Sequence, residues 1–170
     1  YEKIERVYEA NGVSCRKLKL GEEGIISSDL ANTDAQVLHV TPFRSFPTGV
    51  TASASKKREY LEWAANGNRF IVEDDYESEF SLSPKTVDTI FAADGSGRTI
   101  YLNTFSNTLS PALRVGYMLL SDELSEKFAE ELGFYSCSVP VLEQYLIARL
   151  LNDGSFERHL NRVRRNRKRQ

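Results

Sequence analysis

The stretch YLNTFSNTLSPALRVGYMLLS, residues 101–121, decides the fold. It opens inside a strand-like apolar run, RTIYLNT (98–104), and closes with a second one, RVGYMLLS (114–121). The turn between the two runs is rich in Ser and Thr and contains a Pro, residue types that favour turns. The stretch therefore predicts a strand, a polar turn and another strand.

Strands and helices alternate outward from this stretch. Short apolar runs predict further strands, and amphipathic runs that end at Asn-Gly or Asp-Gly predict helices. The additional strands are predicted at 13–20, 35–41 and 69–75, and the helices at 1–12, 52–68, 121–134, 139–154 and 155–170. Such alternation indicates the α/β class, in which a mostly parallel sheet carries helices on both faces.

The composition is that of an ordinary globular domain. The 170 residues are 41% hydrophobic and 27% charged, and the net charge of -2 implies no general affinity for nucleic acid. No apolar run approaches the roughly 20 residues of a membrane span. No charged-then-apolar leader opens the chain, so we expect a cytoplasmic protein without a membrane partner. Both ends fall inside helical patterns, so we expect a segment of a longer polypeptide.

The cysteines and histidines predict no metal site. Cys15 and Cys137 lie far apart, and His39 and His159 are equally isolated in sequence. We therefore expect two reduced structural thiols and no metal ligation. The basic run 155–170 is interpreted as an amphipathic connector because its apolar residues form one stripe, with a nucleic-acid surface as the alternative.

Three polar loops follow predicted strands, and they are the place to look for chemistry. They are TPFRSFPTG (41–49), EDDYESEF (73–80) and NTFSNTLSPALR (103–114). In open α/β sheets, ligands bind beyond the carboxyl ends of the strands. We therefore expect these loops to meet around a single site.

Together the loops resemble those of the pyridoxal-phosphate-dependent aminotransferases of fold type I. More narrowly, they resemble the aminotransferase-like domain of MocR-type transcriptional regulators in the GntR superfamily. The resemblance implies that residues 1–170 are a partial large domain and that 151–170 lead toward a missing small domain. It also implies a homodimer, an amine or amino-acid effector, and DNA binding only through a winged helix-turn-helix domain outside this segment.

The resemblance assigns five residues to the cofactor pyridoxal phosphate. Asp74 would pair with the pyridine nitrogen, and Tyr76 would hydrogen-bond the ring hydroxyl. Thr104 and Ser106 would supply hydroxyl contacts to the phosphate, and Arg114 would supply a planar cationic fork. The alternatives are a solvated acidic turn around Asp74, ordinary turn roles for Thr104 and Ser106, and a surface role for Arg114.

The chain departs from the resembled family at Asn107, where the family has the lysine that bonds to the cofactor. An amide nitrogen neither attacks an aldehyde nor accepts a proton near neutral pH, so we expect no transamination through this residue. The family's Ser-His-Gln is also replaced, by the residues at 43–45. Further parts of the family's site lie outside this segment, so we expect the segment alone to bind cofactor poorly.

Three functions stay open from the sequence. The first, which we favour, is the sensing domain of a regulator without catalysis. The second is a pyridoxal-phosphate-dependent aminotransferase in which a lysine has been substituted. The third is a dimerisation scaffold that has lost its chemistry.

Overall fold

The computed structural model describes residues 2–81 and 88–167. Its centre is a sheet of four strands in the order β3-β4-β5-β6. These strands span Val37–Val40, Phe70–Asp74, Thr99–Thr104 and Gly116–Leu119. β3, β4 and β5 are parallel, whereas β6 runs antiparallel to β5, so the prediction of a mostly parallel sheet is confirmed.

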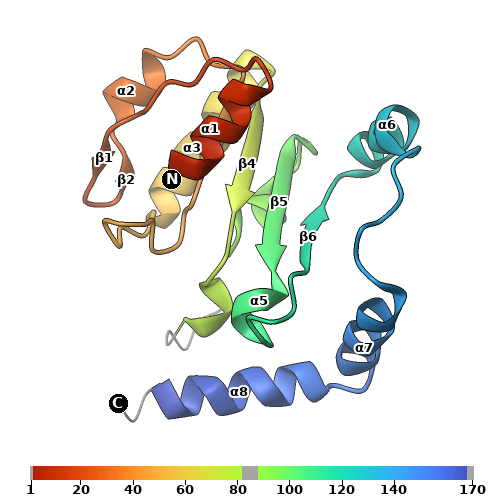
Figure 1. The fold of residues 1–170 in the computed structure, drawn as a ribbon. Helices are drawn as coiled ribbons and strands as arrows, with labels where there is room; N and C mark the ends of the chain where they lie inside the picture. The colour runs from red at the N-terminus through yellow and green to blue at the C-terminus, as the bar shows by residue number, and fades with distance from the viewer. Residues whose placement is uncertain (1, 82–87, 168–170) are drawn as a thin grey trace.

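Helices cover both faces of the sheet, as expected (Figure 1). Side chains alternate between the two faces along a strand. In β3, Leu38 belongs to the core that includes Tyr60 of α3 (Ala54–Gly67). The next residue, His39, points the other way and bonds Tyr8 of α1 (Glu2–Ala10). α1 and α3 therefore lie on opposite faces.

Local signals define α3 at both ends. The Ser53 hydroxyl accepts a hydrogen bond from the Lys56 N–H at 3.3 Å, which is the standard N-cap arrangement. Asn68 ends the helix in the left-handed conformation, at φ 54°. Between these caps, Tyr60, Trp63 and Ala64 are buried against the sheet, and they anchor the main core.

The predicted strand at 13–20 is wrong. Only Leu20–Gly21 (β1) is a strand, and it pairs with Gly24–Ile25 (β2) in a small antiparallel hairpin. Val13 is 48% exposed, and residues 13–19 are in no strand. An apolar alternation without a neighbouring strand cannot form a ladder.

Short helical elements lie between the strands and at their ends. They are α2 (Ser27–Ala31), the 3-10 turn η1 (Ser78–Phe80), α4 (Ile90–Ala93) and α5 (Phe105–Thr108). α5 follows β5 directly, η1 follows β4 after three residues, and both stand at the same edge of the sheet (Figure 1).

Three helices complete the described chain, where helices were predicted. They are α6 (Asp122–Leu132), α7 (Val141–Asn152) and α8 (Ser155–Arg167). α8 runs across the carboxyl edge of the sheet, past α5 and η1 (Figure 1). His159 Nε2 lies 2.9 Å from the Thr108 carbonyl, and the Arg164 guanidinium donates to the Glu79 carbonyl. Residues 168–170 of the predicted helix lie outside the described residues.

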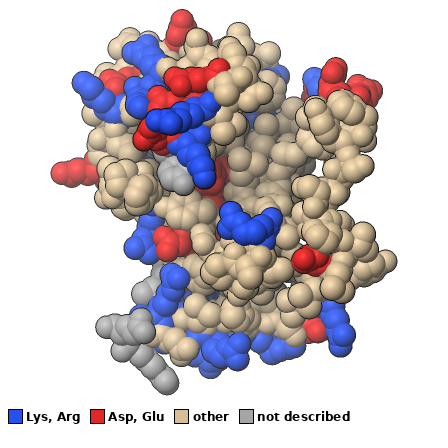
Figure 2. All heavy atoms as spheres, in the orientation of Figure 1, with Lys and Arg blue, Asp and Glu red and all other residues tan. Residues whose placement is uncertain are grey.

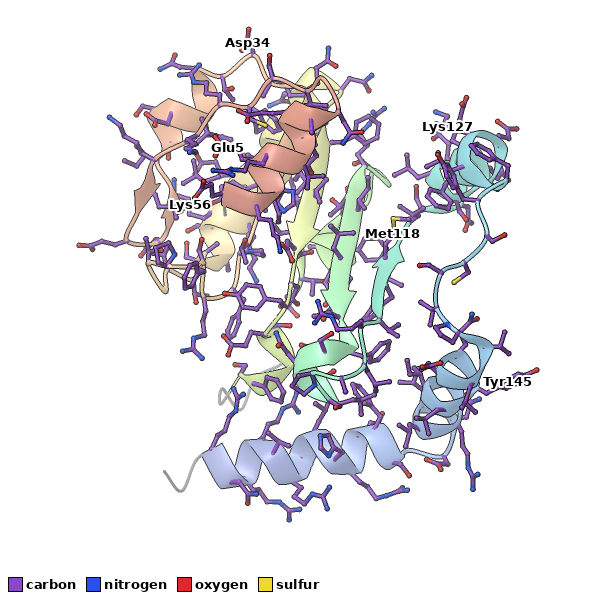
Figure 3. The ribbon with its side chains drawn as sticks, viewed as in Figure 1. Glu5, Asp34, Lys56, Met118, Lys127 and Tyr145 are labelled. Atoms are coloured by element: carbon purple, nitrogen blue, oxygen red, sulfur yellow. The ribbon has the colours of Figure 1, made fainter. Side chains whose placement is uncertain are left out.

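Exposed apolar side chains gather on α7 and on the segment that precedes it. Figure 2 shows acidic and basic side chains together at α6, whereas basic side chains gather along the edge occupied by α8. Tyr145 of α7 is 73% exposed and points away from the sheet (Figure 3). Phe134 and Leu142 are similarly exposed, at 76% and 79%. Within the described residues, no helix is both long and apolar enough to cross a membrane.

Candidate functional site

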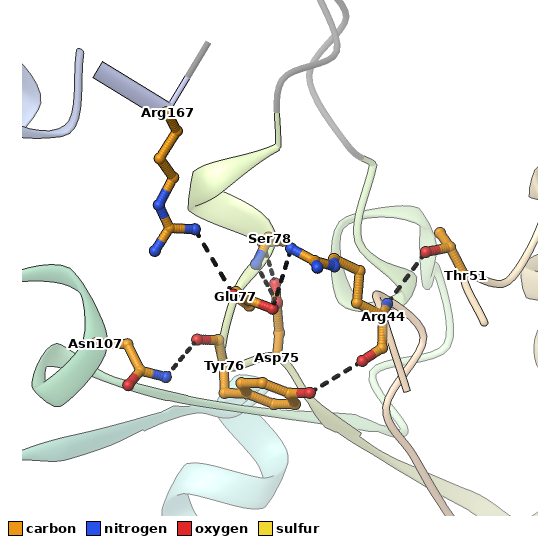
Figure 4. Close-up of polar contacts among 8 residues, drawn as sticks. All are labelled: Arg44, Thr51, Asp75, Tyr76, Glu77, Ser78, Asn107 and Arg167. Carbon is orange, nitrogen blue, oxygen red and sulfur yellow. Dashed lines mark hydrogen bonds and ion pairs between the residues drawn. The ribbon is translucent and has the colours of Figure 1, made fainter. Parts of the chain in front are cut away.

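The three predicted loops meet at the carboxyl edge of the sheet (Figure 4). Asn107 of α5 donates from Nδ2 to the Tyr76 carbonyl at 3.0 Å. The Tyr76 hydroxyl donates to the Arg44 carbonyl at 2.9 Å. Two hydrogen bonds therefore connect the loops after β3, β4 and β5, and the expected convergence is confirmed by the geometry.

Asp74 is the last residue of β4, and its side chain lies on the face covered by α1. Its Oδ2 is 3.6 Å from Nε2 of His39, whose Nδ1 lies 2.8 Å from the Tyr8 hydroxyl. If the hydroxyl donates to Nδ1, the neutral ring carries its proton on Nε2, facing Asp74. Burial, with the nearby Cys15 and Asp74, raises the pKa of Tyr8, so the hydroxyl keeps its proton.

His39 was missed as a site residue because its neighbours in sequence carry no chemistry. The alignment of β3 with β4, the strand register, could have identified His39. In the parallel pair, His39 aligns with Val72 of β4, one side-chain repeat before Asp74 on the same face. A histidine in β3 can therefore reach the carboxylate at the end of β4.

Asp75, next to Asp74, has a different role. It is only 2% exposed, and it accepts hydrogen bonds from the Tyr101 hydroxyl at 2.9 Å and the Ser78 N–H at 3.0 Å. The Ser78 hydroxyl also donates to it. Asp75 thus fixes the turn that contains Tyr76, and Asp74 is left facing the other side of the sheet.

A buried polar network lies behind this turn. Asn103 donates to Glu79 at 2.6 Å and to the Tyr101 hydroxyl at 2.7 Å. Burial raises the pKa of Glu79 and of Tyr101, and it raises the pKa of Tyr117 to about 12. Glu73, 1% exposed, accepts from two backbone N–H groups at the start of α4. The network makes this end of the sheet rigid and acidic.

Thr104 and Ser106 lie in the predicted turn, and both have structural roles. The Thr104 hydroxyl caps α5 by accepting from the Ser106 N–H at 3.1 Å, and it donates to the Val115 carbonyl at 3.1 Å. The Ser106 hydroxyl donates to the Leu113 carbonyl at 2.6 Å. Each hydroxyl has one proton, and a backbone carbonyl accepts it here. The turn alternative is therefore realised, and their contact with phosphate stays a prediction.

Arg114 is exposed and near Ser106. Its Nη1 lies 3.4 Å from the Ser106 Oγ. Across the described ranges, 2–81 and 88–167, Arg114 forms no ion pair with a carboxylate. A guanidinium has five N–H donors, so most of its donors remain available for an anion.

Glu77 connects the site to α8. Its two carboxylate oxygens lie 3.5 Å from Arg44 Nη1 and 3.7 Å from Arg167 Nη1 (Figure 4). The Arg44 backbone, at φ 50°, is in the left-handed region, and its N–H donates to Thr51. Although residues 43–45 differ from the Ser-His-Gln of the resembled family, the loop at 41–49 still contacts the loop at 73–80 through Arg44 and Glu77. In the part of the chain that is described, no cluster of His, Cys, Asp and Glu could hold a metal ion.

Comparisons with known proteins agree with this geometry. No family model matches the chain. The HTH-type transcriptional regulator YhdI of Bacillus subtilis is 32% identical over 164 residues, which cover 96% of this chain and 35% of YhdI. The probable rhizopine catabolism regulatory protein MocR of Rhizobium meliloti is 29% identical over 91% of this chain and 31% of MocR. The chain thus spans about a third of the length of these relatives.

Among solved structures, Pyrococcus horikoshii kynurenine aminotransferase in complex with PMP is similar over 97% of this chain and 43% of its own. Its TM-score is 0.83 and its identity 26%. Both the regulator relatives and the aminotransferase fold were expected from the three loops. The chain is a homologue of the HTH-type transcriptional regulators that include MocR, and it has the fold of the fold type I aminotransferases over the part that it spans.

Proposed function

We propose that this chain is the ligand-sensing, aminotransferase-like part of a MocR-type transcriptional regulator, and that it binds a pyridoxal-phosphate-type ligand without transamination. The observation that carries the proposal is Asn107. It lies at the centre of the loop cluster, at the position of the resembled family's lysine, and donates to Tyr76.

The residues present fit such a ligand in three respects. Asp74 has no Lys or Arg partner among the described ion pairs, and its side chain is 25% exposed, so it can accept a hydrogen bond from a protonated ring nitrogen. Tyr76 presents a phenol oxygen that can accept a hydrogen bond, because its own proton goes to the Arg44 carbonyl. Arg114 presents a guanidinium without a carboxylate partner for a phosphate. When bound, pyridoxal phosphate supplies an electron sink for amine chemistry.

His39 would act on the ligand through Asp74. His39 Nε2 lies 3.6 Å from the Asp74 carboxylate, so His39 can position that carboxylate toward a protonated ring nitrogen. Asp75 positions the Tyr76 turn from the opposite side. These residues can bind, orient and keep one proton in place.

Asn107 cannot move a proton or act as a nucleophile. The lone pair of its amide nitrogen is delocalised, and its N–H group already faces a carbonyl. Binding without turnover suits a regulator, in which occupancy is the signal. The relatives are described as HTH-type regulators, so we propose that another part of the protein binds DNA. We also propose that the protein acts in the cytoplasm and that its effector is an amine or an amino acid.

Self-association is a second part of the proposal. The exposed apolar side chains of α7, among them Val141, Leu142 and Tyr145, would be covered in a homodimer. Analytical ultracentrifugation of the intact protein tests this. A monomer at micromolar concentration would contradict it.

The experiment that tests the main proposal combines binding and turnover in the intact protein. We expect saturable binding of pyridoxal phosphate and no transfer of an amino group to a keto acid. Asn107→Lys restores an amine at the centre of the site, so a visible-absorbance change on adding pyridoxal phosphate is expected in that variant alone. Measurable amino-group transfer by the unaltered protein would establish the aminotransferase alternative instead.

A further inference from the structure

The orientation of the Asn107 amide is fixed by its partner. A backbone carbonyl only accepts hydrogen bonds, so the Asn107 NH₂ group, and not its oxygen, must face the Tyr76 carbonyl. The amide oxygen, Oδ1, consequently points away from that contact (Figure 4). Asn107 is exposed, and no hydrogen bond to Oδ1 from another described residue is formed. The site therefore presents a free acceptor where the family's lysine presents an amine.

The two common forms of the ligand differ in the group that a residue at this position would meet. The aldehyde form, pyridoxal 5'-phosphate, carries an oxygen that only accepts hydrogen bonds. The amine form, pyridoxamine 5'-phosphate, carries a primary amine that is an ammonium near neutral pH and donates three hydrogen bonds. The amide oxygen can accept a charge-assisted hydrogen bond from the ammonium. The second N–H of the amide offers the aldehyde oxygen only a neutral hydrogen bond, which is about half as strong.

The two carboxylates near Tyr76 differ in their cationic partners. Burial raises the pKa of Tyr76, and after burial the carboxylates of Glu77 and Asp74 are the main causes that raise this pKa. Arg44 opposes them and is paired with Glu77 at 3.5 Å. Arg167 also faces Glu77, at 3.7 Å, and Arg114 faces Ser106. The carboxylate of Asp74 thus has no guanidinium of its own.

On the basis of the proposed function, we infer that the pocket selects the amine form of the ligand over the aldehyde form, and that Asn107 Oδ1 is the residue atom that determines this specificity. The chain would then sense pyridoxamine 5'-phosphate, or a related 4'-amine, in preference to the aldehyde that the family's lysine captures.

The test is calorimetric titration of the intact protein with three ligands. These are pyridoxamine 5'-phosphate, pyridoxal 5'-phosphate, and 4'-deoxypyridoxine 5'-phosphate, which lacks both groups and reports on the rest of the pocket. A hydrogen bond to a charged donor corresponds to about tenfold in affinity. We expect the amine form to bind about tenfold more tightly than the other two.

Two variants separate specificity from a structural role. Asn107→Leu removes the acceptor at similar size, so the preference for the amine form should disappear while binding of the 4'-deoxy ligand is retained. Asn107→Lys places a second cation near the ammonium, so the aldehyde form should become the tighter ligand.

Three results would overturn the inference. Equal or tighter binding of the aldehyde form by the unaltered protein refutes the specificity and leaves the proposed pocket in place. An equal loss for all three ligands in Asn107→Leu assigns Asn107 to folding of the turn only. No binding of any of the three refutes both the inference and the proposed function.

Discussion

Arg114 provides the sharpest test of a phosphate site, because its charge can be removed without disturbing the turn. Its guanidinium is exposed and makes one long contact, 3.4 Å from Nη1 to the Ser106 Oγ. In Arg114→Gln the side-chain amide can still donate to that hydroxyl. We therefore expect the free energy of unfolding to change by no more than about 0.5 kcal/mol, as for other exposed positions.

The loss of affinity follows from the charge. A hydrogen bond to a charged group contributes about 1.5–3 kcal/mol, and about 1.4 kcal/mol corresponds to a factor of ten in affinity. Arg114→Gln should therefore bind pyridoxamine 5'-phosphate roughly 10- to 100-fold more weakly. Binding of pyridoxamine, which has no phosphate, should not change.

Calorimetric titration of both ligands into both proteins measures this double difference. Arg158→Gln is the matched control, because Arg158 is also an exposed arginine but lies at the start of α8, where it pairs with Asp153. It should bind both ligands normally. An equal weakening for pyridoxamine and its phosphate, or no weakening for either, would show that Arg114 holds no phosphate.

Two further predictions concern stability. Tyr60→Phe removes the buried hydroxyl that accepts a hydrogen bond from the Ile25 N–H at 2.7 Å, so urea unfolding should show a free energy of unfolding lower by about 1–3 kcal/mol. The control Tyr145→Phe, at a 73% exposed site, should show no change, and equal results for the two variants would refute the reasoning. Burial acts to raise the pKa of Asp94, but hydrogen bonds from Ser96 and Thr99 outweigh it and hold the pKa below 3.8. Because this pKa is lower in the folded state, Asp94 stabilises the fold above about pH 3.8, and this contribution is lost as the pH falls further. In acid titrations of the free energy of unfolding, the Asp94→Asn variant should not show this loss.

The parallel strands could be predicted from sequence because their signals are local. Apolar runs at 37–40 and 70–74 are bounded by polar residues and turns, and most of the central residues of these runs are buried in the sheet. The failure at 13–20 has the opposite cause. Its alternating pattern is equally local, but a strand also needs a partner, and only Leu20–Gly21 has one. Whether a strand finds a partner depends on the tertiary structure, which the alternation of residues 13–20 does not specify.

The site was predictable at the level of loops and not of individual contacts. Parallel topology alone brings the ends of β3, β4 and β5 to one edge. The contact between His39 and Asp74 depends on register between strands, which the sequence does not specify. The different roles of Asp74 and Asp75 follow from strand alternation, so their opposite facing could have been predicted once the strand was placed.

Two separate physical causes account for the residue types around Asn107. The hydroxyls of Thr104 and Ser106 bond the backbone of the returning strand, so folding alone accounts for these residues. Asn107 is exposed and makes one hydrogen bond, to Tyr76, so its identity is nearly free of folding constraints. Exchange of an amine for an amide at this position changes the chemistry of the site at little cost to the fold. The turn can therefore persist without a lysine at this position, and we propose that Asp74 and Arg114 serve a ligand that is bound and not converted.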